Sequence, residues 1–333
     1  MKQTVMTLAE ETEKVKKEIK KAGSHTGLGA LLYIVVLGIV SVIGMIPIVF
    51  QYIHAGQTGQ ILSISTADLV NMFMDHPYTG TAFLAGSLIA LLAVFLFFLK
   101  QGTHKQLFCS TKAMTLKKFG VLLCVMYLFS AIGEACYQLI EMELNLFGFS
   151  TSLGKEMASG NVSNLPMFLY AGVVGPIVEE LVFRGLLLRR LEKHGKLVAI
   201  FATSVLFGLM HENLPQVLSA TMIGFVLGYI ALEYSVIWSV VLHIFNNLVM
   251  CITLTRVLEG ANELVQNLIY RGFTWVTVMI AIVSIVRSRK SVVDWIRNHM
   301  GEKCALIWVF TSGGMLVAIV FFIIGTMGTV MLG

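Results

Sequence analysis

The sequence predicts an all-α, polytopic transmembrane helical bundle with about nine membrane spans. Hydrophobic residues make up 56% of the 333 residues, charged residues only 13%, and the mean hydropathy is +0.81. This composition leaves too little polar surface for a shell that faces water, so lipid must supply the surroundings. The second observation is a series of long apolar runs, because a helix needs about 20 apolar residues to cross the hydrocarbon core.

Nine segments meet or approach that length: residues 28–53, 78–99, 119–140, 164–188, 197–214, 216–234, 236–258, 268–286 and 304–332. Almost no polar sequence separates the fifth segment from the sixth, so a partly re-entrant region at 197–234 would reduce the count to eight. We expect a single transmembrane domain, residues 28–332, with no domain-scale repeat.

A charged segment, residues 1–27, precedes the first span. Val5, Leu8, Thr12, Val15 and Ile19 fall on one helical stripe among Glu and Lys residues, which fits an amphipathic helix on the membrane surface or against a partner. A solvated charged tail is an equal alternative. The segment lacks the features of a cleaved signal peptide, so we expect it to be retained.

The distribution of basic residues predicts the orientation of the chain. With the N-terminus in the cytoplasm, the cytoplasmic segments hold six, five, four and five of the 24 Lys and Arg residues, as expected for loops that stay inside. Residues 54–77 and 141–163 are then the longer external loops, and the C-terminus is external. The net charge of +5 is mostly this topology signal, so we expect no nucleic-acid partner. The lack of an obvious organelle signal favours a multi-pass protein of the cell membrane.

Ionisable residues in the predicted spans are concentrated in a few of them. Each such residue at a helix centre costs about 2.5–3.5 kcal/mol to insert, so it needs a structural or functional reason. Glu180 and Arg184 lie four residues apart on one helical face and can form an ion pair. Glu179 is rotated by about 100°, which leaves its carboxylate free to act as a base. A packing network between helices is the alternative interpretation.

Two histidines and an asparagine accompany these charges. Counting about 1.5 Å per residue from the basic loops puts Glu179, His211 and His243 all at mid-membrane depth. His243 and Asn247 lie four residues apart and can donate two hydrogen bonds to a developing oxyanion. A single buried His or Asn is usually a satisfied contact between helices, but this combination favours a catalytic site.

Three motifs follow one another in order: Glu179-Glu180-x-x-x-Arg184, Phe207-x-x-x-His211 and His243-x-x-x-Asn247. They resemble the E-E-x-x-x-R, F-x-x-x-H and H-x-x-x-N/B motifs of the CPBP family of intramembrane proteases, which includes CAAX-type prenyl endopeptidases and bacteriocin-processing enzymes. The resemblance covers about residues 164–250, the expected catalytic core. It implies that Glu179 and His211 hold and activate the attacking water and that His243 and Asn247 stabilise the oxyanion. Glu180, Arg184 and Phe207 would be structural support.

The resemblance implies an intramembrane endopeptidase that cuts a membrane-associated or lipidated protein or peptide. Prenylated CAAX proteins, pheromone or bacteriocin precursors and other membrane-embedded segments are all allowed as substrates, and the oligomeric state is not indicated. We favour a mechanism without a cofactor. A Zn²⁺ variant stays open, because Glu179, His211 and His243 could supply an oxygen and two nitrogens to the ion.

Two other functions compete with proteolysis. In a proton-coupled transporter, the same buried carboxylates and histidines would form a relay, but we find no matched pair of Gly/Pro-broken spans in two halves. A non-catalytic immunity protein of the same fold is the third candidate, although every motif position is filled. Glu134, in the third predicted span, is expected to be a buried acid that lines a substrate path or packs between helices.

Overall fold

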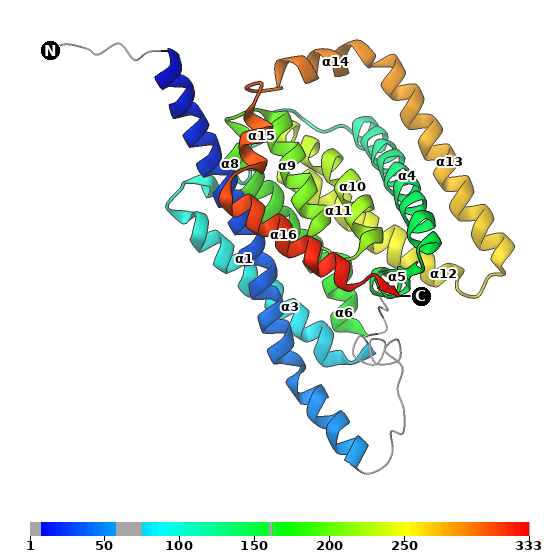
Figure 1. The fold of residues 1–333 in the computed structure, drawn as a ribbon. Helices are drawn as coiled ribbons and strands as arrows, with labels where there is room; N and C mark the ends of the chain where they lie inside the picture. Colours follow the sequence, from blue (N-terminus) through cyan, green and yellow to red (C-terminus); the bar gives the residue numbers. More distant parts are fainter. Residues whose placement is uncertain (1–7, 58–74, 160–161, 163, 333) are drawn as a thin grey trace.

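The computed structural model describes residues 8–57, 75–159, 162 and 164–332. In this part of the chain the structure is a bundle of helices (Figure 1). Seven helices are long and apolar enough to cross a membrane, and two shorter apolar helices, Lys196–Leu209 and Gly313–Gly328, accompany them. The prediction of an all-α transmembrane bundle is therefore confirmed.

The helices before the central region are α1 (Leu8–Gln57), α3 (Pro77–Leu99), the short 3₁₀ helix η1 (Thr103–Gln106), α4 (Leu116–Leu146) and α5 (Ser152–Ser159). Those after it are α13 (Glu263–Arg287), α14 (Arg289–Asn298), α15 (Ala305–Phe310) and α16 (Gly313–Gly328). A two-residue strand β1 (Phe149–Ser150) pairs antiparallel with β2 (Met331–Leu332). This pair ties the far end of the chain to the end of α4.

The central region consists of two interrupted helices and a helical hairpin. The first interrupted helix runs through α6 (Leu165–Leu169), η2 (Tyr170–Val174), α7 (Gly175–Glu180), η3 (Leu181–Leu187) and α8 (Leu188–Glu192). The hairpin is α9 (Lys196–Leu209) with α10 (Leu214–Glu233), and the second interrupted helix is α11 (Val236–Ile244), η4 (Phe245–Leu254) and α12 (Thr255–Leu258). The segments η2, η3 and η4 are π-helical. Wide turns of this kind inside α-helices are frequent at functional sites.

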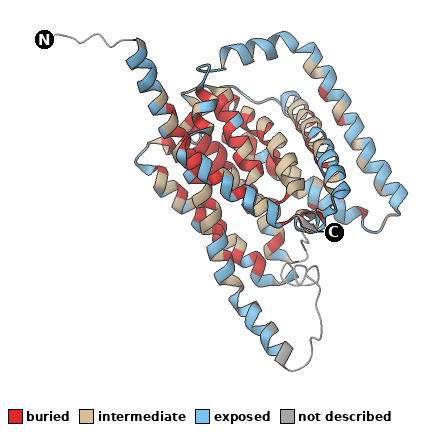
Figure 2. Cartoon of the chain, viewed as in Figure 1, coloured by how far each residue is buried: buried red, intermediate tan, exposed pale blue. Residues whose placement is uncertain are grey.

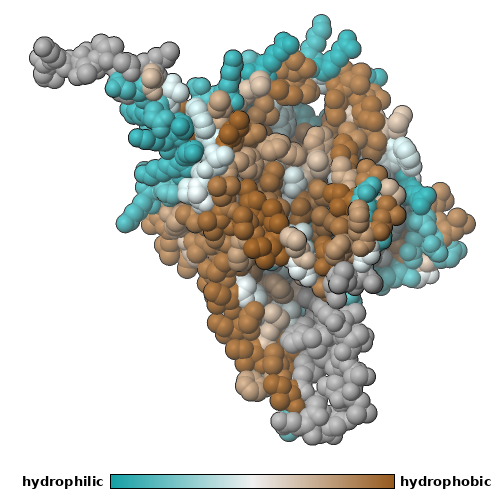
Figure 3. Space-filling view, viewed as in Figure 1, coloured by the Kyte–Doolittle hydropathy of each residue, from teal (hydrophilic) through white to brown (hydrophobic). Residues whose placement is uncertain are grey.

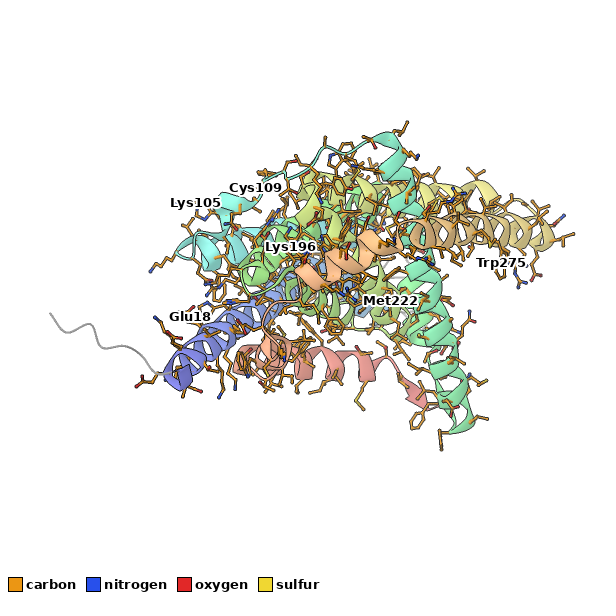
Figure 4. The ribbon with its side chains drawn as sticks, turned by 90° about the horizontal axis from the view of Figure 1, so that it is seen from above. Glu18, Lys105, Cys109, Lys196, Met222 and Trp275 are labelled. Atoms are coloured by element: carbon orange, nitrogen blue, oxygen red, sulfur yellow. The ribbon has the colours of Figure 1, made fainter. Side chains whose placement is uncertain are left out.

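Buried residues concentrate in these central helices, whereas α13 and α14 are largely exposed (Figure 2). Large apolar side chains face outward on the peripheral helices, as with Phe50 on α1, Leu96 on α3 and Ile324 on α16. Seen from one end of the bundle, Trp275 lies on α13 at the periphery (Figure 4). An apolar exterior is the arrangement that a lipid environment favours.

Helix α1 joins the charged N-terminal segment to the first span without a break. Its first described residue is Leu8, and Ile19 and Ala22 are buried. A side chain at Gly23 would meet the backbone of Val309, so α1 packs closely on α15 at this point. The second half of the segment therefore lies against the C-terminal helices, and Val5, which was assigned to the amphipathic stripe, is outside the described residues.

Several expected boundaries differ in the structure. Helix α4 continues to Leu146 and α5 follows it, so most of the expected loop 141–163 is helical. The final predicted span is broken at Thr311–Ser312 into α15 and α16, and residues 210–213 form a turn between α9 and α10. Most of the other expected loop, 54–77, is outside the described residues.

Glu134 is exposed on α4, so the expectation of a buried acid was wrong. Gly133 takes the position that faces α10, where an added side chain would meet the backbone of Ser219. Glu134 points about 100° away from that contact, and its carboxylate accepts a hydrogen bond of 2.9 Å from Gln138.

Segments rich in Lys and Arg meet at one end of the bundle. Lys112, before α4, and Lys196, at the start of α9, both form ion pairs with Glu233 at the end of α10. The backbone N–H of Leu197 donates to the carbonyl of His299, after α14, over 3.1 Å. Hydrophilic residues cover this end over α14 and the start of α1, above a largely apolar surface (Figure 3). The cytoplasmic location of this end remains a prediction.

Candidate active site

Glu180 lies at the centre of a buried polar cluster. Its side chain is 0% exposed, and its Oε1 atom accepts hydrogen bonds from Arg184 Nη1 and His243 Nδ1, both at 3.0 Å. Ser239 Oγ donates to the other carboxylate oxygen. The ion pair that the i, i+4 spacing of Glu180 and Arg184 predicts is therefore confirmed.

Arg184 is buried with Glu180 and stabilised by two further contacts. Its guanidinium carbon lies 4.0 Å from the centre of the Phe207 ring, and Nη2 donates to the carbonyl of Gly224 over 3.4 Å. The contact with an aromatic face and the opposite charge of Glu180 both lower the cost of burying a cation. This cluster joins η3, α9 and α10 around one carboxylate.

Glu179 has a different environment from its neighbour. Its side chain is 15% exposed, and its Oε2 atom lies 3.9 Å from His243 Nε2. Because Glu180 already engages Nδ1 of the same imidazole, the two carboxylates lie on opposite sides of the His243 ring. Glu179 therefore faces Nε2, the ring nitrogen that Glu180 does not bind.

His211 and His243 are brought together by the Phe207 ring. The centre of that ring lies 5.2 Å from the imidazole of His211 and 5.8 Å from that of His243, with the planes nearly perpendicular in both cases. Glu179 also lies within electrostatic range of His211. Glu179, His211 and His243 thus share one site, although the sequence places them on three separate segments.

Hydrogen bonds fix which nitrogen of each imidazole faces the site. His211 Nδ1 lies 2.8 Å from the carbonyl oxygen of Phe207, and a carbonyl oxygen only accepts, so Nδ1 carries the hydrogen. The same reasoning applies to His243 Nδ1 against the Glu180 carboxylate. In the neutral form of each ring, Nε2 is therefore a hydrogen-bond acceptor.

Asn247 lies one turn beyond His243 in η4 but is directed elsewhere. Its Nδ2 donates to the carbonyl of Ala171 over 3.1 Å, and its Oδ1 accepts from Asn246 over 3.1 Å. In this arrangement, the amide links η4 to η2 rather than pointing with His243 at one position. Its assignment to the oxyanion remains a prediction.

Two residues of this region were missed from the sequence. Ser239 is fully buried and binds Glu180 and the carbonyl of Leu227; its position four residues before His243 is the signal that could have identified it. Tyr33, on α1, is 1% exposed and packs its ring 6.1 Å from that of Phe183. Nothing in the local sequence distinguishes it from the other eight tyrosines.

The donor set has the chemistry of a zinc site but not the arrangement. A carboxylate and two imidazole Nε2 atoms are suitable ligands for Zn²⁺. In the described part of the chain, however, no group of three His, Cys, Asp or Glu side chains is placed to hold one metal ion. We therefore derive no catalytic step through a metal.

Comparisons with known proteins match the same part of the chain. Residues 161–249 match the family described as type II CAAX prenyl endopeptidase Rce1-like. The candidate membrane peptidase YdiL of Bacillus subtilis (strain 168) is 34% identical over 85 residues, which is 25% of this chain and 34% of that protein. The match thus spans about a third of the relative's length. No solved structure matches the chain.

The matched residues contain all three motifs that form the buried cluster and its neighbours. Glu179 and Glu180 are at the end of α7, His211 is in the turn after α9, and His243 is in α11. The resemblance predicted from these motifs is confirmed. Residues 161–249 of this chain are therefore similar to the CAAX-type family of membrane proteases.

Proposed function

We propose that this chain is an intramembrane endopeptidase in which Glu179 activates a water molecule for attack on a peptide carbonyl. The observation that carries the proposal is the division between two adjacent carboxylates. Glu180 is fully buried and bound by Arg184, Ser239 and His243, whereas Glu179 lies 3.9 Å from His243 Nε2 and is partly exposed. A carboxylate that is not committed to an ion pair is available to accept a proton.

The reaction transfers one proton in each of two stages. Glu179 accepts a proton from water as the water oxygen bonds to the carbonyl carbon, and the carbonyl electron pair moves onto its oxygen. The Nε2 lone pair of His211 accepts a hydrogen bond from the same water and fixes its orientation. When the tetrahedral intermediate collapses, the C–N bond breaks and the proton on Glu179 passes to the leaving amine.

We propose that His243 and Asn247 stabilise the oxyanion. For each side chain, the hydrogen bonds in the structure set a condition for donating to it. His243 Nε2 donates only in the imidazolium form, because the bond to Glu180 places the single hydrogen of the neutral ring on Nδ1. Asn247 must exchange its bond to the carbonyl of Ala171 for one to the oxyanion. A further donor in the site would therefore contribute directly to catalysis.

The proposed substrate is a membrane-embedded or lipidated peptide. The matching family is described as prenyl endopeptidases of CAAX proteins, and prenylated CAAX proteins, peptide precursors and other membrane segments all fit a site built among apolar helices. We propose that the chain lies in the cell membrane, with the basic end in the cytoplasm.

Cleavage by purified protein in liposomes tests the proposal. The probes are a farnesylated CAAX peptide, an unlipidated hydrophobic precursor peptide and a single-span transmembrane peptide, with products identified by mass spectrometry. We expect wild type to release fragments from one of them and His211→Ala to lose this activity. A well-folded wild type that cuts no probe but moves a solute across the bilayer in a His211-dependent way would instead be a carrier.

Chelator treatment in the same assay tests the metal question. We propose hydrolysis without a resident metal, so cleavage should continue when divalent ions are removed. Loss of cleavage that returns when Zn²⁺ is restored would contradict this part of the mechanism and assign Glu179, His211 and His243 as ligands.

A further inference from the structure

Tyr33 carries a buried hydroxyl that the mechanism above does not use. The residue lies in the middle of α1, outside the family match, and is 1% exposed. Its Oη atom is buried and has no hydrogen-bond partner among the described residues. A buried hydroxyl without a hydrogen-bond partner costs free energy. We therefore expect a bound molecule, rather than this chain, to supply the partner.

The hydroxyl lies within electrostatic range of Glu179, the proposed catalytic carboxylate. The Tyr170 hydroxyl lies within the same range. The Tyr33 ring meets Phe183 edge to face, and Phe183 in turn lies 5.4 Å from Phe207, whose ring contacts both imidazoles. A continuous layer of aromatic rings thus leads from α1 to the site.

Three of the motif side chains that face the site present acceptors to it. The Glu179 carboxylate accepts, and Nε2 of His211 and Nε2 of His243 accept in their neutral forms, as the bonds at Nδ1 require. One amide hydrogen of Asn247 and the hydroxyl hydrogen of Ser239 are already donated within the chain. The Tyr33 hydroxyl has a hydrogen to donate and no partner for it.

We propose that Tyr33 is a further catalytic residue, whose hydroxyl donates a hydrogen bond to the carbonyl oxygen of the substrate as that oxygen becomes negative. This proposal rests on the proposed peptidase function and places α1 in the active site. No covalent bond forms at Tyr33 and its proton is not transferred. The hydroxyl stabilises the tetrahedral intermediate and releases it when the carbonyl re-forms.

The substitution Tyr33→Phe removes one oxygen and keeps the ring against Phe183. Loss of one oxyanion donor lowers kcat by about 10²–10³ with little change in KM, because the interaction strengthens only in the transition state. The matched control is Tyr127→Phe, because the hydroxyl of Tyr127 is also buried without a partner but lies between α4 and α13, against Phe273. This control should leave kcat unchanged.

The assay uses the full-length protein in liposomes and the farnesylated CAAX peptide, or whichever of the other two probes wild type cuts fastest. Equal kcat for wild type, Tyr33→Phe and Tyr127→Phe would overturn the role of Tyr33 while leaving the peptidase function intact. If wild type cuts none of the probes, the peptidase function itself fails. The two failures are therefore distinguishable.

A second variant separates hydrogen-bond donation from packing if Tyr33→Phe melts at a lower temperature than wild type. A polyfluorinated tyrosine at position 33 keeps the ring and hydroxyl but loses its proton at lower pH than tyrosine. We expect kcat of this variant to fall with rising pH over a range in which wild type holds its rate. Identical pH profiles for the two proteins would overturn the proposal.

Discussion

At the scale of single residues, the neighbouring carboxylates Glu179 and Glu180 differ in what surrounds them. Glu180 is held by Arg184, Ser239 and His243 and is inaccessible, whereas the contact of Glu179 with His243 is 3.9 Å long. Removing one partner of a buried ion pair leaves an uncompensated charge and costs about 3–5 kcal/mol. Structural and chemical roles are thus assigned to adjacent positions by a rotation of about 100° along one helix.

This division predicts different effects of two equivalent substitutions. Glu180→Gln should lower the melting temperature markedly, because Arg184 would remain buried without its counter-charge. Glu179→Gln should melt close to wild type, since Arg184 keeps its ion pair with Glu180. Thermal unfolding in detergent measures both variants, and equal melting temperatures for the two would show that Glu180 does not have the structural role.

The sequence predicts part of this site because some of its contacts are local. The pairing of Glu180 with Arg184 follows from a spacing of four residues in a helix. Tyr33 could not be assigned in this way, since it lies on α1 and its role depends on how that helix packs. Whether the Asn247 amide points at a substrate or at the carbonyl of Ala171 likewise depends on tertiary structure.

At the scale of helices, a close contact between α9 and α10 positions His211. A Cβ atom at Gly208 would lie 1.9 Å from Thr221 Oγ1 and 2.3 Å from the backbone oxygen of Val217. The N–H of His211 donates to the carbonyl of Gly208 over 3.1 Å. Any separation of the two helices would therefore move the imidazole.

The substitution Gly208→Ala should destabilise the protein and reduce cleavage together. The backbone of Val217 cannot move aside cheaply, so α9 and α10 must separate, at a cost of about 1–3 kcal/mol. Gly272→Ala, on α13, is the control, because an added Cβ meets no atom within 4 Å there. Melting temperature and cleavage rate are measured for both, and a Gly208→Ala protein that behaves like the control would contradict this packing.

Long apolar runs predict the existence of these helices better than the π-helical turns and breaks within them. The runs identified segments corresponding to the central helices, but the π-helical turns of η2, η3 and η4 were not expected. A π turn adds one residue without altering the apolar character of a span, so composition does not reveal it. The break between α15 and α16 was missed for a similar reason, because Thr311 and Ser312 are two polar residues in a long apolar run.

At the scale of the whole molecule, the two described ends of the chain lie at opposite ends of the bundle (Figure 1). The C-terminal strand pairs with β1, after the end of α4, whereas the start of α1 lies at the end that holds Lys112 and Lys196. An odd number of crossings produces this arrangement. It agrees with the nine predicted spans when the two shorter apolar helices are included.

We predict that the basic end is cytoplasmic, because Lys and Arg are enriched on that side of membrane proteins. Single cysteines are introduced at two exposed positions, Lys105 and Phe147, in a protein without its native cysteines. Each cysteine reports the side of the membrane on which it lies. A membrane-impermeant thiol reagent applied to intact cells should label position 147 directly and position 105 only after permeabilisation. The reverse pattern would invert the topology.

The most direct test of the central claim is a comparison of peptide cleavage by wild type and Glu179→Gln. Both proteins are purified, matched for melting temperature and reconstituted in liposomes, and fragments of the three probe peptides are quantified by mass spectrometry. Because general-base catalysis contributes about 10²–10⁴ in rate, we expect Glu179→Gln to cut at least about 10²-fold more slowly than wild type. A folded Glu179→Gln protein that cuts at the wild-type rate would contradict the assignment of Glu179 as the base.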